Sequence, residues 1–113
     1  MSDLSHKRCI PCEGGIPKMT LEQAQDLMPQ IPAWTLSEEG TRITRLFTFK
    51  DFARALAFAN DVGKIAEAQW HHPDIKLSWG KVEVMLATHS VRGLTENDFI
   101  VAAKINDLQS LRG

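Results

Sequence analysis

Three of the four histidines stand at positions where their chemistry could be combined. His71 and His72 are adjacent and directly precede Pro73, while His89 follows the last predicted strand. Imidazole exchanges a proton near neutral pH, so several such rings are suited to general acid and base catalysis. Glu67 stands four residues before His71, the spacing at which a carboxylate on a helix binds an imidazole and fixes its tautomer. The pattern favours a site for proton transfer.

The histidines and the two cysteines also allow structural, metal-binding and redox interpretations. A single histidine is usually a surface or capping residue, and a zinc site of three histidines would show a short ligand spacing that this chain lacks. Cys9 and Cys12 form a C-x-x-C motif, with His6 as a further candidate zinc ligand. No strand or helix is predicted around this motif, which disfavours both a thioredoxin-like redox pair and a zinc site. We expect reduced cysteines, no bound metal and no cofactor.

The tryptophans and one aspartate complete the set of candidates. Trp34, Trp70 and Trp79 are most simply explained as core anchors, and Trp70 would continue the buried face of a long helix. A flat heteroaromatic ligand would stack on such a ring, and Trp79 is the candidate for that role. Asp98 is expected at the third position of the last helix, where a carboxylate stabilises the helix N-terminus.

The elements that must position these side chains are three helices and two hairpins. A capping box at 20–23 begins a short helix that Pro29 ends, and strands are predicted over 34–36 and 42–48. A long helix follows and must end by Pro73. Its buried stripe is predicted to comprise Phe52, Ala55, Leu56, Ala59, Val62, Gly63 and Ala66.

Alternation over 75–79 and 82–86 predicts a second hairpin that turns at Gly80, and a last helix is predicted over 95–108. The order is α-β-β-α-β-β-α. Because hairpins pair antiparallel, the predicted fold is an α+β two-layer sandwich, in which a four-stranded antiparallel sheet carries three helices on one face.

Size and charge limit the classes of protein that need to be considered. The chain has 113 residues and a formal net charge of -1, which suits one domain without a broad cationic surface. Binding to nucleic acid or to an acidic membrane is therefore disfavoured, and no apolar run is long enough to cross a bilayer. We expect a cytoplasmic protein with a flexible arm over 1–18 and a single domain over 19–113.

Several of these residues, taken in order, resemble the signature of the pterin-4a-carbinolamine dehydratases. The resemblance is carried by Glu67-Ala-Gln-Trp-His-His-Pro73, Trp79, Lys81-Val82, Thr88-His89, Gly93-Leu94-Thr95 and Asp98. It extends from about Thr20 to Leu108, and the fold of that family agrees with the predicted order of elements.

The resemblance implies an enzyme that dehydrates 4a-hydroxytetrahydropterin to quinonoid dihydropterin, recycling the pterin for aromatic amino-acid hydroxylation. It implies that His71, His72 and His89 are catalytic. Supporting roles are implied for Glu67 and Asp98, and substrate contacts for Trp79 and Pro73. A small pterin and further copies of the chain, as a homodimer or homotetramer, are the expected partners. The alternative is a non-catalytic binding module, or a dimerisation or transcriptional cofactor, on the same fold; the three histidines favour catalysis.

Overall fold

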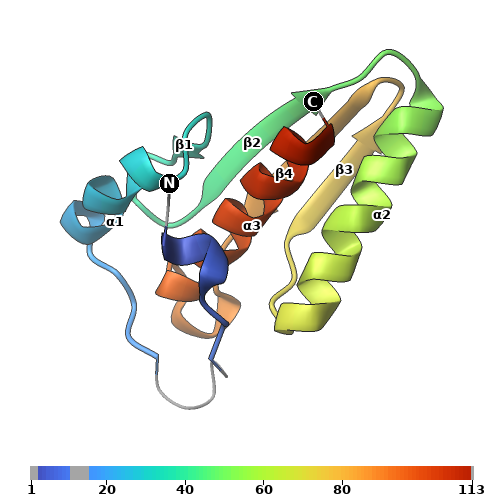
Figure 1. Ribbon diagram of the computed structural model, residues 1–113. Coiled ribbons are helices and arrows are strands. Elements are labelled where there is room, and N and C mark those ends of the chain that lie inside the picture. Colours follow the sequence, from blue (N-terminus) through green and yellow to red (C-terminus); the bar gives the residue numbers. More distant parts are fainter. Residues whose placement is uncertain (1–2, 11–15, 113) are drawn as a thin grey trace.

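The computed structural model describes residues 3–10 and 16–112 (Figure 1). Its helices are α1 (Leu21–Leu27), α2 (Phe52–Gln69) and α3 (Glu96–Arg112). Its strands are β1 (Thr35–Leu36), β2 (Ile43–Thr48), β3 (Asp74–Ser78) and β4 (Lys81–Leu86). Short 3-10 turns are η1 (Asp3–His6), η3 (Met28–Gln30) and η4 (His89–Val91). Three helices and four strands in this order confirm the predicted α+β fold.

All four strands pair antiparallel, in the spatial order β1-β2-β4-β3. The central pair is β2 with β4, aligned from Ile43 opposite Leu86 to Thr48 opposite Lys81. The two strands of this pair are far apart in the chain, because α2 and β3 lie between them. The β3–β4 hairpin turns at Gly80, whose φ of 71° belongs to the left-handed region that glycine adopts without a steric penalty.

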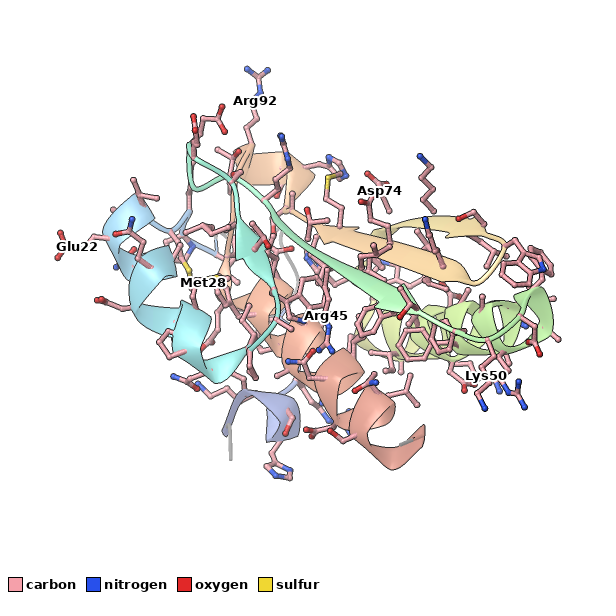
Figure 2. The ribbon with its side chains drawn as sticks, turned by 90° about the horizontal axis from the view of Figure 1, so that it is seen from above. Glu22, Met28, Arg45, Lys50, Asp74 and Arg92 are labelled. Carbon is pink, nitrogen blue, oxygen red and sulfur yellow. The ribbon has the colours of Figure 1, made fainter. Side chains whose placement is uncertain are left out.

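Two layers are visible in Figure 1, where α2 and α3 cover one face of the sheet and α1 lies at the β1 end. Apolar side chains from both layers form the core, among them Ile43, Phe47, Phe58, Val62, Val82, Val84, Leu86 and Phe99. The other face of the sheet is open, and Asp74 projects from it (Figure 2). No helix among the described residues is both long and apolar enough to cross a bilayer.

Strand β2 carries an arginine on its inner face, which explains why its sequence mixes polar and apolar positions. Arg45 points toward α3 (Figure 2), and its Nη1 donates to Asn106 Oδ1 at 2.6 Å. The guanidinium carbon lies 4.4 Å from the centre of the Phe47 ring. Burial lowers the pKa of Arg45 below its ordinary value. Leu46 therefore takes the open face and is exposed.

The long helix buries a slightly different face from the predicted one. Its buried residues are Ala55, Phe58, Val62 and Ala66. The prediction that Phe52 and Leu56 face inward is wrong, because both are exposed. The buried face is turned toward Phe58, whose ring lies 4.7 Å from that of Phe47 and 5.1 Å from that of Phe49. These contacts with β2 and the residue after it, rather than the helical period alone, select the face.

The 3-10 turn η1 packs on the outer side of α3. Leu4 of η1 is buried in the core, and Lys7 Nζ lies 2.8 Å from Glu96 Oε2. Covered by η1 on one side and the sheet on the other, α3 buries every residue from Phe99 to Ala103. A single apolar residue has no periodicity, so the sequence did not indicate this contact. The flexibility of 1–18 stays a prediction; Cys9 is half-buried, and Cys12 lies outside the described residues.

Candidate active site

The site begins where α2 ends. Trp70 adopts a left-handed backbone conformation (φ 52°, ψ 43°), and the N–H groups of Trp70 and His71 both donate to the carbonyl of Ala66. Such a conformation costs an L-residue other than glycine about 1–2 kcal/mol. It ends α2 at Gln69, before the two histidines. The reversal buries the first histidine and leaves the second exposed.

His71 forms a buried pair with Asp98 of α3. Its Nε2 lies 2.6 Å from Asp98 Oδ1, and the two side chains are 7% and 0% exposed. The other carboxylate oxygen accepts the Thr88 hydroxyl at 2.8 Å and the Thr95 N–H at 3.0 Å. Because Thr88 gives its only hydroxyl proton to Asp98, the 2.9 Å contact between the two threonine hydroxyls must have Thr95 as its donor. Asp98 thus stands at the third position of α3, as predicted, and also holds His71.

His72 forms a second, exposed pair with Glu67. Its Nε2 lies 2.6 Å from Glu67 Oε2, and the side chains are 47% and 69% exposed. The sequence predicted that Glu67 would bind His71, and this is wrong. The i, i+4 geometry needs a continuous helix, but α2 ends between these two residues. The Trp70 ring stands edge-on to the His72 ring, with their centroids 4.9 Å apart and their planes at 82°.

Both pairs leave the same ring nitrogen available. An ionised carboxylate only accepts hydrogen bonds, so Nε2 carries the proton in each pair and Nδ1 remains to exchange a proton with a ligand. No buried side-chain nitrogen or oxygen in the described part of the chain lacks a partner. Within the described part of the chain, Nδ1 of His71 and Nδ1 of His72 make no hydrogen bond. Each imidazole is therefore held through Nε2 alone.

His89 lies at the same end of the sheet as this pair of sites. It follows β4 in η4 and is exposed, so it is not a core residue. Asp74 at the start of β3 is opposite Met85 near the end of β4. The segments 71–73 and 87–89 therefore leave the β3–β4 hairpin at the same end.

The other predicted site residues are more dispersed. Pro73 is half-buried between His72 and β3, next to the histidines. Trp79 follows the far end of β3, a strand of five residues or about 17 Å, so the structure does not bring it to the histidines, which precede this strand. Its exposed ring is not a core anchor, and neither is that of Trp70, which is 75% exposed; both predictions are wrong. Trp34 is buried and confirms its prediction.

Thr88 is the residue that sequence reasoning missed. It has the same strand parity as Val82, Val84 and Leu86, which all face the core. A hydroxyl on a buried face needs a hydrogen-bond partner, so this parity could have indicated a polar contact beneath the sheet. The sequence placed its partner, Asp98, at the start of the last helix, and the resemblance implied a supporting role for it, but neither indicated a contact with Thr88.

The histidines do not line the cavity beside α1. A cavity of about 720 Å³ lies between α1 and the residues before it, lined by Ile16, Met19 and Leu27 among others and by no histidine. Within residues 3–10 and 16–112, no three His, Cys, Asp or Glu side chains are grouped so as to hold a metal ion. The site is a set of paired imidazoles at one end of the sheet.

The fold and these pairs describe an α+β protein with a histidine–carboxylate cluster at one end of its sheet. A family model described as Pterin 4 alpha carbinolamine dehydratase matches residues 17–108. A protein of Methylococcus capsulatus, provisionally named pterin-4-alpha-carbinolamine dehydratase, is 48% identical over 105 residues, covering 93% of this chain and 92% of its own. The chain belongs to the pterin-4-alpha-carbinolamine dehydratase family.

Solved structures show the same fold. A transcriptional coactivator/pterin dehydratase from Brucella melitensis is 34% identical with a TM-score of 0.76, over 81% of this chain and 98% of that one. A pterin dehydratase-like protein, identified as a RuBisCO assembly factor of the alpha-carboxysome, is 20% identical with a TM-score of 0.58, over 70% and 92% of the two chains. The second likeness concerns the fold alone.

Proposed function

We propose that this protein removes water from a 4a-hydroxytetrahydropterin to give the quinonoid dihydropterin. The observation that carries the proposal is the presence of two histidine–carboxylate pairs, each with a 2.6 Å contact, at one end of the sheet in a chain of this family. One pair is buried and the other faces solvent, and both present an open ring nitrogen.

The reaction moves two protons and needs no other reagent. The bond between C4a and the hydroxyl oxygen breaks as that oxygen receives a proton and leaves as water. N5 gives up its own proton as the C4a=N5 double bond forms. One proton is delivered and one is taken, so the catalyst needs an acid and a base that act near neutral pH. General acid–base catalysis of this kind raises the rate roughly 10²–10⁴-fold.

We assign the proton transfers to His71, His72 and His89. Asp98 and Glu67 act as positioning residues, because each holds Nε2 of one ring and turns the other nitrogen outward. The quinonoid product is an oxidised pterin, so the reaction that follows must be a reduction that restores the tetrahydropterin used in aromatic amino-acid hydroxylation. A cytoplasmic homodimer or homotetramer stays part of the proposal.

The direct test is an assay on freshly generated pterin 4a-carbinolamine, in which the absorbance of the quinonoid product is recorded over time. We expect the purified protein to accelerate dehydration above the uncatalysed rate. A rate equal to the uncatalysed one would reject the enzyme and leave the non-catalytic binding module on the same fold.

Substitution of the histidines tests the site itself. We expect His71→Ala, His72→Ala and His89→Ala each to lower kcat by roughly 100-fold, because each removes a proton donor or acceptor. His6→Ala is the matched control, since this fourth histidine is exposed in η1. Circular dichroism should show a folded protein in each case. Unchanged rates in the three site variants, or equal losses in the control, would contradict the assignment.

A further inference from the structure

Trp70 is an unusual choice of residue for its position. Glycine or asparagine adopts the left-handed conformation at a helix end at little cost, whereas a side chain with a Cβ is strained there. The strain in Trp70 is not offset by burial, because 75% of the residue is exposed. A large apolar ring that is strained, solvent-facing and outside the core does not serve the fold.

The position of the ring points to a ligand at the histidines. Its centroid lies 4.9 Å from that of His72, whose Nε2 is held by Glu67. A flat molecule lying on the open face of the indole would therefore lie beside an imidazole that is already oriented. Trp79, the other exposed tryptophan, is a strand length away and has no such neighbour.

We infer that Trp70 is the aromatic platform on which the flat pyrimidinone half of the pterin stacks, beside His72. The inference rests on the proposed function and adds a residue that determines substrate affinity. Stacking of a flat heterocycle on an aromatic side chain favours offset or edge contacts at centroid distances of about 4.5–7 Å, so the indole and the imidazole can contact one ligand together.

The test compares Trp70→Asn with the control variant Phe52→Asn, which replaces an exposed aromatic residue at the opposite end of α2. Asparagine tolerates the left-handed backbone, so Trp70→Asn should fold and melt a few degrees higher, roughly 4 °C. Binding of 7,8-dihydropterin, a stable isomer of the product, is measured by equilibrium dialysis. We expect Trp70→Asn to raise Kd and KM roughly tenfold with kcat within about twofold, as for loss of one stacked base. Phe52→Asn should leave both constants unchanged.

The outcomes separate this inference from the proposed function. If the unsubstituted protein binds dihydropterin but does not accelerate dehydration, the proposed function fails, and the Kd of Trp70→Asn still decides the platform. If the protein is active and Trp70→Asn keeps its Kd and KM within twofold, the platform is wrong. A changed oligomeric state in size-exclusion chromatography with unchanged Kd would assign Trp70 to a contact between copies and would also overturn the inference.

Discussion

Two histidine–carboxylate pairs of equal length stand in opposite environments. His71 and Asp98 are almost fully buried, and the carboxylate is held by two further donors. His72 and Glu67 are exposed, and their contact lies in solvent at the end of α2. A buried pair cannot lose one partner without leaving the other unsolvated, whereas water replaces an exposed partner at little cost. The first pair should therefore determine stability and the second mainly reactivity.

The largest effect is expected from Asp98→Ala in the buried pair. The change leaves His71, the Thr88 hydroxyl and the Thr95 N–H without their acceptor. We expect the free energy of unfolding to fall by about 3–5 kcal/mol. Urea denaturation measures it, and Asp107→Ala on the exposed side of α3 is the control. A loss below about 1 kcal/mol would remove the distinction between the two pairs.

A smaller effect on the same network is expected from Thr88→Val. Valine keeps the shape of the side chain but removes the donor to Asp98 and the acceptor for the Thr95 hydroxyl. We expect a loss of about 1–3 kcal/mol in the free energy of unfolding. Thr48→Val on the exposed face of β2 is the matched control and should change stability by no more than about 0.5 kcal/mol. Equal effects at the two positions would show that the buried hydroxyl does not support the pair.

The smallest effect on stability is expected from Glu67→Gln in the exposed pair. The free energy of unfolding should change by no more than about 0.5 kcal/mol, because the contact is solvated. The rate should fall about tenfold, which corresponds to about 1.4 kcal/mol in the barrier, since His72 loses the charge that orients its ring. Glu22→Gln in the first turn of α1 should change neither quantity. A stability loss as large as that of Asp98→Ala would contradict the comparison.

Local patterns predicted most of the fold. The capping box at Thr20 is present, with Gln23 N donating to the Thr20 hydroxyl and Thr20 N donating to the Gln23 side chain. Both hairpins were predicted because alternation and a turn glycine are properties of neighbouring residues. The spatial order β1-β2-β4-β3 was not, because it depends on packing between residues that are distant in the chain.

The sequence by itself determined the helices, the strands and the set of histidines and carboxylates available for chemistry, since periodicity and caps act within a few residues. Only the tertiary structure decided which partners meet. One left-handed residue, Trp70, ends α2 early, so that His71 turns to Asp98 and His72 takes Glu67. Spacing along a helix predicts contacts only while the helix continues. Beyond the end of α2, the direction of the chain is set by long-range packing against α3 and the sheet.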